Sequence, residues 1–196
     1  MKKNKIEIYL LAFVLIFISC KKEIETVLEP DLIVIDFYYG EDNYEKNIRD
    51  NSKPIIVKER NILEIDVNKN GECKIEGKII QDSLIVHELK KYLTPNPENS
   101  KMPQTIESEF TYAGKVTMNE DLLVSALFDK DLNYKNYSRI RNKIYSAYNE
   151  TRNEFTKEKY GKTLYELMNS SEEIDDIQWS ELAEIIPFNY VEVIDK

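Results

Sequence analysis

The side chains of this chain that could do chemistry are mainly carboxylates, together with one histidine and two cysteines. The run Asp66-x-Asn68-x-Asn70-Gly71 matches the start of an EF-hand calcium loop. Position twelve of that loop must be a bidentate glutamate, and here it is Gly77. The flanking residues also alternate as strands do. A structural zinc site normally takes four Cys or His side chains, more than this chain holds. We therefore expect no metal and no other cofactor.

An acidic group near the C-terminus has a structural explanation. Glu172, Glu173, Asp175 and Asp176 fall in the first turn of a predicted helix that begins near Ile174. Negative charge is favourable there because the unpaired amides at a helix N-terminus carry partial positive charge. This placement favours a stabilising role for the group over a metal site.

No set of residues suited to enzyme catalysis stands out. The lone His87 lies on a predicted helix from Asp82 to Leu93, on the polar face beside Lys90 and opposite the apolar residues. A Ser-His-Asp or Cys-His arrangement is therefore not convincing, and the five glycines form no phosphate-binding loop. Carboxylates are abundant, but the sequence does not show which of them lie together. The number of carboxylates alone therefore does not exclude a glycosidase, which uses a pair of them. We predict that the chain is not an enzyme.

Length and charge narrow the remaining classes. The chain has 196 residues, enough for one ordinary domain or two small ones with a real core. Its 36 acidic residues exceed its 27 basic ones, which gives a formal net charge of -9. Binding to nucleic-acid phosphates needs clustered Lys and Arg, so DNA and RNA are not expected partners.

The N-terminus has the layout of a secretory leader. Three lysines precede an apolar run from Ile8 to Ile18, and Ser19-Cys20 follow. A helix rises about 1.5 Å per residue, so a run of roughly twelve residues is too short for a hydrocarbon core of about 30 Å. A small residue before Cys20 resembles the lipobox of bacterial lipoproteins. We expect residues 1–19 to be a signal or anchor segment and Cys20 to carry lipid, with an uncleaved short anchor as the alternative.

The second cysteine, Cys73, has no intrachain partner if Cys20 carries lipid. No disulfide is therefore expected, although the compartment would be oxidising. Cys73 falls in a strand-like run, which favours a buried and unreactive thiol.

Residues 20–60 begin as a polar tether and then hold a predicted strand from Leu32 to Tyr39. β-branched and aromatic residues fill this strand, and Gly40 ends it. It has two interpretations, which both stay open. It pairs with a partner or a second copy by β-augmentation, or it completes the sheet of its own chain. The predicted docking residues are Leu32, Ile33, Val34, Ile35, Phe37 and Tyr38.

Residues 61–196 alternate between strand and helix patterns. Ile62–Val67 and Glu72–Ile75 alternate around a turn and predict a β-hairpin. The next predicted element is a helix that ends at Leu93 and that Asp82 can cap, followed by a loop from Thr94 to Pro103. A strand at 122–128 and a long helix at 134–160 come next, and Gly161 is placed to end that helix. Helices at 164–168 and 174–186 and a strand at 190–194 complete the chain. The continuous apolar run at 122–128 predicts a strand covered on both faces. This order predicts an α/β (α+β) fold, a small mixed β-sheet with helices packed on one face.

Several local sequences carry a resemblance to a known family. They are Ile65–Gly71, Lys74–Lys78, Tyr134–Tyr137, Ala147–Arg152, Lys159–Lys162 and the closing Ile186-Pro187. Together with the order of elements, over about residues 61–194, they resemble the periplasmic domain of the ExbD/TolR family of biopolymer-transport proteins. The C-terminal segments are similar to an ExbD subgroup with an extended C-terminus.

The resemblance implies a dimeric cell-envelope protein with its domain in the periplasm, anchored to the membrane by its N-terminus. It implies ExbB/TolQ-like and TonB/TolA-like protein partners. In that family a carboxylate inside the transmembrane helix serves the proton step, whereas the apolar run here holds no ionisable residue. We therefore expect protein docking in a transport system driven by the proton-motive force, and we assign no residue to a proton relay. The alternative is a lipid-anchored periplasmic module that binds peptidoglycan or an outer-membrane partner.

Overall fold

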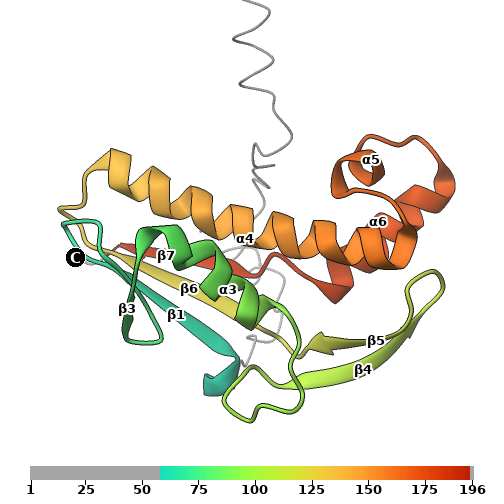
Figure 1. Ribbon diagram of the computed structural model, residues 1–196, viewed down its shortest axis with the longest axis horizontal. Helices are drawn as coiled ribbons and strands as arrows, with labels where there is room; N and C mark the ends of the chain where they lie inside the picture. The colour runs from blue at the N-terminus through green and yellow to red at the C-terminus, as the bar shows by residue number, and fades with distance from the viewer. Residues whose placement is uncertain (1–57, 195–196) are drawn as a thin grey trace, which may run out of the picture. The chain divides into compact units, whose positions relative to one another are not determined.

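The computed structural model describes residues 58–194, and Figure 1 shows how their helices and strands are arranged. The strands are β1 (Ile62–Val67), β2 (Cys73–Ile75), β3 (Lys78–Ile80), β4 (Thr105–Phe110), β5 (Gly114–Asn119), β6 (Leu123–Phe128) and β7 (Tyr190–Ile194). The helices are α3 (Ile85–Leu93), α4 (Tyr134–Tyr160), α5 (Leu164–Met168) and α6 (Glu173–Ile185), and the 3₁₀ turns are η1 (Glu59–Asn61) and η2 (Asp82–Leu84). The predicted strand at Leu32–Tyr39 lies outside the described residues.

The main sheet has five strands in the order β3-β2-β1-β6-β7. β1, β2 and β3 follow one another through tight turns and pair antiparallel, so the predicted hairpin is confirmed. β6 pairs parallel with β1, and β7 pairs parallel with β6. Parallel neighbours need a crossover connection, and helices supply it here. The sheet is therefore mixed, with β3 and β7 at its edges.

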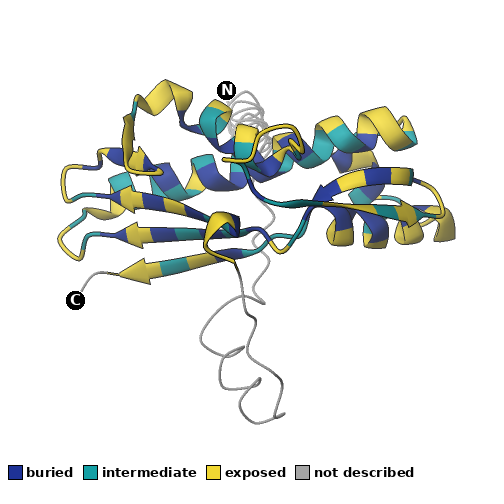
Figure 2. Ribbon diagram, turned by 90° about the horizontal axis from the view of Figure 1, so that it is seen from below, coloured by how far each residue is buried: buried dark blue, intermediate teal, exposed yellow. Residues whose placement is uncertain are grey.

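α3 and α4 cover one face of this sheet (Figure 1). Buried and exposed residues alternate along the strands, as Figure 2 shows, because successive side chains point to opposite faces. The buried side chains that the two helices contribute include Ile85, Leu89 and Leu93 from α3 and Ile140, Ile144, Ala147 and Tyr148 from α4. The predicted fold, a small mixed sheet with helices packed on one face, is confirmed.

The flanking residues set the ends of α4. Asn133 precedes the helix, and its side-chain oxygen accepts a hydrogen bond from the Asn136 amide at 3.0 Å. That bond satisfies one of the amides that every helix leaves unpaired at its N-terminus. Gly161 follows the helix with a φ of 68°, a left-handed conformation that glycine adopts without strain. The predicted end of the long helix is therefore confirmed.

The predicted cap of the first helix is wrong. Asp82 begins the 3₁₀ turn η2, and the N-cap of α3 is Leu84, which makes no side-chain cap. The Asp82 carboxylate instead forms ion pairs with Arg139 and Lys143 of α4. Cations on a neighbouring helix therefore stabilise this carboxylate in place of the backbone amides of its own helix.

β4 and β5 form a separate antiparallel hairpin that was not among the predicted elements. A carboxylate from α6 holds its turn. Glu181 is buried and accepts hydrogen bonds from the amides of Tyr112 and Ala113 at 3.0 Å each, and from the Tyr160 hydroxyl at 3.2 Å. At the other end, the buried side chain of Asn61 bonds to the backbone on both sides of the hairpin. Buried polar groups thus fix the hairpin at both ends.

The cover of β6 differs from the prediction. Val124, Ala126 and Phe128 are buried on the face that α4 covers, but Leu127 is 37% exposed on the other face. The expectation of a strand covered on both faces is therefore wrong for the described structure.

Within residues 58–194, no helix combines the length and the apolar character needed to cross a bilayer.

Candidate functional site

The sheet face opposite α3 and α4 has no covering helix or strand in the part of the chain that the structure describes (Figure 2). We call it the open face. Its outward side chains include Glu64, Asp66, Lys74, Ile79, Ser125, Leu127, Val191 and Val193. The strand register places Asp66 between Lys74 and Leu127, with Val193 next to Leu127. One row of side chains therefore crosses the sheet from a charged half, which has the exposed Ile79 at its β3 edge, to an apolar half.

The apolar half consists of Leu127, Val191 and Val193, which we call the apolar strip. Their exposed fractions are 37%, 40% and 45%. Single exposed apolar residues are normal on protein surfaces, but these three lie on two adjacent strands at one side of the sheet. β-branched residues in a strand usually pack under a covering layer. The apolar strip is thus a surface that another protein segment is suited to cover.

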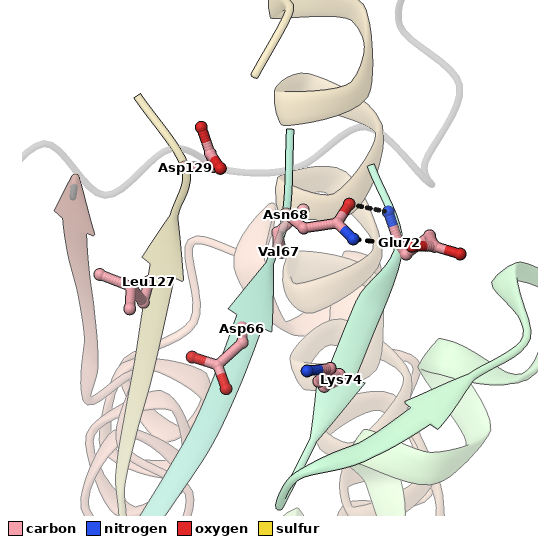
Figure 3. A pocket seen from close by; sticks show the side chains of 7 residues that line it. All are labelled: Asp66, Val67, Asn68, Glu72, Lys74, Leu127 and Asp129. Carbon is pink, nitrogen blue, oxygen red and sulfur yellow. Dashed lines mark hydrogen bonds between the residues drawn. The ribbon is translucent and has the colours of Figure 1, made fainter. Parts of the chain in front are cut away.

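The charged half holds a pocket of about 220 Å³, drawn in Figure 3. It is lined by Asp66, Val67, Asn68, Glu72, Lys74, Leu127 and Asp129. The Asn68 side-chain oxygen accepts hydrogen bonds from the amides of Asn70 and Glu72 at 3.0 and 3.1 Å, and its amide group donates to the Glu72 carboxylate at 2.7 Å. The calcium-like sequence therefore serves to close the turn between β1 and β2.

Metal binding finds no support at this pocket. Across residues 58–194, no three side chains of Asp, Glu, His or Cys converge on a position where they could hold one ion. Asp66 and Lys74 are cross-strand partners on the open face, so opposite charges stand side by side there. The charged half is suited to polar contacts at the rim of an interface.

β7 presents a row of backbone groups at the edge of the sheet. Its other row faces β6, where the Val124 amide donates to the Asn189 carbonyl at 2.9 Å. Backbone groups alternate sides along a strand, so Val191 and Val193 also turn theirs toward β6. The residues that turn their N–H and C=O groups outward are Tyr190, Glu192 and Ile194. Within the described residues no strand pairs with this outer row.

On the covered side, a polar network around Glu192 fastens β7 to α4. The Glu192 carboxylate accepts hydrogen bonds from the Tyr137 hydroxyl at 2.6 Å and from Arg141 Nε at 2.7 Å. Arg141 also donates to the Tyr145 hydroxyl at 2.8 Å. Burial and the neighbouring carboxylate raise the pKa of Tyr137 to about 12, so its hydroxyl stays protonated and keeps donating at neutral pH. The network holds β7 in place without using its outward backbone groups.

The other residues singled out from the sequence have structural explanations. His87 is exposed on α3, as predicted. Cys73 is 2% exposed, and burial raises its pKa to about 11, so the thiol stays protonated and unreactive at neutral pH. Asp175 is buried and accepts a hydrogen bond from Lys162 at 2.6 Å, and this bond lowers the pKa of Asp175. The acidic group therefore contains an ion pair that ties the start of α6 to the loop before α5.

The predicted functional residues and the observed surface do not coincide. Cys20 and the predicted docking residues within Leu32–Tyr39 lie outside the described residues. The apolar strip was not predicted, because Leu127 was expected to be buried. A signal for it exists in Ser125, which interrupts the apolar run two residues before Leu127 and therefore shares its face.

Comparison of the chain with protein-family models, with characterised proteins and with solved structures finds no match. The functional argument therefore starts from the open face and the edge of β7.

Proposed function

We propose that this chain is a tethered docking protein of the cell envelope, of the ExbD/TolR type, which binds partner proteins through the open face and the edge of β7. The observation that carries the proposal is the apolar strip, which lies directly beside the outward backbone row of β7. A mixed sheet with helices on one face supports the resemblance at the level of architecture. The N-terminal Ser19-Cys20 supports a lipid tether.

The two parts of the surface supply different contributions. Full burial of a Val or Leu side chain contributes about 1.5–3 kcal/mol, and the three side chains of the apolar strip are less than half exposed. Covering the strip is therefore worth about 3 kcal/mol in total, which is less than the usual cost of association. The backbone row of β7 adds main-chain hydrogen bonds, which give β-augmentation its affinity and its register. Both parts are needed for a stable contact.

The tether sets how far the domain reaches. A chain spans at most about 3.3–3.6 Å per residue, so the segment between Cys20 and Lys58 covers at most about 130 Å. A lipid-anchored domain on such a segment reaches partners in the periplasm. In this role the chain acts by docking to ExbB/TolQ-like and TonB/TolA-like proteins, with Leu32–Tyr39 as a second docking element, and no residue of it relays protons.

Co-purification from membranes tests the proposal. The full chain is expressed together with the ExbB/TolQ-like and TonB/TolA-like proteins of the same cell, and the amounts that co-purify are compared between variants. Val191→Lys with Val193→Lys places two charges on the apolar strip, and we expect at least a tenfold loss of the partner. The matched control is Ile174→Lys with Ile177→Lys, two exposed apolar residues on α6, and it is expected to retain the partner.

Two results would count against the proposal. If neither type of partner co-purifies with the parent chain, the ExbD/TolR assignment fails. If the α6 control loses the partner as fully as the β7 variant, the open face is not the docking surface. Retention on purified peptidoglycan without either partner protein would instead favour the lipid-anchored binding module. Mass spectrometry of the mature N-terminus tests the tether separately, with an acylated Cys20 expected and an intact Met1 contradicting it.

A further inference from the structure

We infer that the pocket in the charged half of the open face receives an arginine side chain of the docking partner. The inference rests on the proposed function, because it names the chemistry of the partner segment that lies beside the apolar strip. Three observations carry it. They are the charges that line the pocket, the absence of hydrogen bonds from Asp66 to the rest of the lining, and the position of the pocket beside Leu127.

The lining of the pocket carries an excess of negative charge. Asp66, Glu72 and Asp129 contribute three carboxylates, against the single ammonium group of Lys74. Asp66, Glu72 and Lys74 are exposed, so a partner can reach them. The whole chain is acidic as well, with a formal net charge of -9, and its field favours the approach of a cationic segment. The charge of the pocket therefore favours a cation as its occupant.

The hydrogen bonds of the lining leave Asp66 available. The side chains of Asn68 and Glu72 are joined at 2.7 Å, and Asp129 Oδ1 accepts a hydrogen bond from a backbone amide at 2.8 Å. No hydrogen bond joins Asp66 or Lys74 to another residue of the lining (Figure 3). Asp66 therefore has both carboxylate oxygens available to a donor from outside the lining.

The spread of the carboxylates favours an arginine over a metal ion. A metal ion needs several oxygens around a single point, and no three acidic, histidine or cysteine side chains within residues 58–194 converge in that way. A guanidinium is planar and presents five N–H donors in different directions, so it can bond to carboxylates that lie apart. The pocket holds about 220 Å³, less than the roughly 300–1,000 Å³ of pockets for drug-sized ligands, which suits a single side chain.

The strand register shows which part of the partner supplies the arginine. Val193, Leu127 and Asp66 form one row on the adjacent strands β7, β6 and β1, which lie about 4.8 Å apart. A segment paired with the edge of β7 would lie about 14 Å from β1, too far for its side chains to reach Asp66. The arginine therefore belongs to a segment that lies over the open face and covers the apolar strip. Its methylene groups pack on Leu127 while the guanidinium enters the pocket.

Lys74 limits where the cation lies. It stands opposite Asp66 on β2 and repels a second positive charge. Leu127 of β6, and Asp129 after it, lie on the other side of Asp66 from Lys74 (Figure 3). We therefore expect the guanidinium between Asp66 and Asp129, on the side of the pocket away from Lys74.

A titration with a model compound tests the inference. The isotope-labelled full chain in detergent micelles is titrated with N-acetyl-arginine amide, and the backbone amide shifts of Asn68, Glu72 and Asp129 report binding at the pocket. The control compound is N-acetyl-citrulline amide, which has nearly the same shape but no charge. Hydrogen bonds between a cation and a carboxylate are roughly twice as strong as neutral ones, so we expect a dissociation constant about tenfold higher for the citrulline compound.

Matched variants test the effect of each charge. Asp66→Asn with Asp129→Asn keeps the shape of the lining and removes two negative charges, so we expect the dissociation constant for the arginine compound to rise about tenfold. Lys74→Met removes the repelling ammonium group, and we expect the constant to fall about threefold. The control is Glu173→Gln with Glu184→Gln, which removes two exposed carboxylates from α6 and should leave the constant within about twofold.

Equal binding of the arginine and citrulline compounds would overturn the inference, and so would an unchanged dissociation constant in the Asp66→Asn, Asp129→Asn variant. A loss of equal size in the α6 control would show that only the overall charge acts, which also overturns it. The titration contains no ExbB/TolQ-like or TonB/TolA-like protein. The pocket can therefore bind the arginine compound while co-purification fails, and the partners can co-purify with a chain whose pocket does not bind it, so the inference and the proposed function fail separately.

Discussion

The buried carboxylate of Glu181 offers a quantitative test of how the β4–β5 hairpin is held. It accepts hydrogen bonds from the amides of Tyr112 and Ala113 at 3.0 Å each and from the Tyr160 hydroxyl at 3.2 Å. Hydrogen bonds to charged groups contribute about 1.5–3 kcal/mol, and a buried donor left without a partner costs about 1–3 kcal/mol. The Glu181→Ala change removes the shared acceptor of all three donors.

The free-energy cost of losing the Glu181 acceptor differs between the donors. Ala113 is buried, so we expect its amide to stay without a partner, whereas Tyr112 is 38% exposed, so we expect water to replace the carboxylate there at less cost. We therefore expect Glu181→Ala to lower the free energy of unfolding by about 2–4 kcal/mol. Glu181→Gln keeps one acceptor oxygen and should cost about 1–2 kcal/mol. Urea denaturation of the folded domain measures both values.

A local readout distinguishes a clamp on the hairpin from a general loss of packing. Hydrogen exchange at the Tyr112 and Ala113 amides should accelerate in Glu181→Ala before the main sheet shows any change. Glu184→Ala, on the exposed side of the same helix, should alter stability by no more than about 0.5 kcal/mol. If Glu181→Ala proves as mild as Glu184→Ala, or if exchange at the turn stays slow, Glu181 does not anchor the hairpin.

Two further predictions concern the β1–β2 hairpin. Gly71 has a φ of 80°, and a Cβ there would lie 2.6 Å from Asn136 Nδ2, whereas Gly77, with a φ of 71°, has nothing within 4 Å. Gly77→Ala should therefore cost only backbone strain, about 1–2 kcal/mol, and Gly71→Ala should cost more in urea denaturation; equal losses would show that the contact is absorbed without cost. Burial raises the pKa of Cys73 from 9.0 to about 11, so its contribution to stability is complete below pH 9 and is lost as the pH rises toward 11, by about 3 kcal/mol. Cys73→Ala should flatten the decline of stability over that pH range, and an unchanged slope would contradict the assignment.

Local signals in the sequence were enough to predict most of the fold. The alternation around Asn68–Gly71 predicts the β1–β2 hairpin, and Gly161 predicts the end of α4, because a turn and a left-handed residue each depend on a few neighbouring positions. α6 begins and ends within one residue of its predicted bounds. These features need no knowledge of what packs against them.

Features that depend on distant partners were not predictable in the same way. Asp82 looked like a helix cap, but Arg139 and Lys143, more than fifty residues away in the chain, determine its role. The β4–β5 hairpin was missed although Ile106, Ser108 and Phe110 alternate with charged residues, a pattern that is short and weakly apolar. Its stability comes from Glu181 on α6, which no local pattern reveals.

The candidate site was missed for a related reason. An apolar side chain in a strand reports that something covers it, but the sequence does not say whether the cover is the same chain or another one. Residues 122–128 form a nearly continuous apolar run, and the run was therefore interpreted as a strand covered on both faces. Among the described residues this second face has no cover, and the proposed function assigns the exposed apolar side chains to a docking surface.

The two edges of the main sheet differ in how far they are protected against pairing with another strand. Exposed edges invite unwanted pairing, and proteins usually protect them by short strands, charges or covering turns. β3 carries the exposed Ile79, but it has only three residues, begins with Lys78 and runs into η2. The separate β4–β5 hairpin also carries charges, because its Glu107 and Lys115 form an ion pair at 3.0 Å. β7 has none of these protections on the open face, where both of its side chains are valines. Among the described residues no strand pairs with the outer side of β7, and for that reason we expect the partner of the proposed docking function to use this edge.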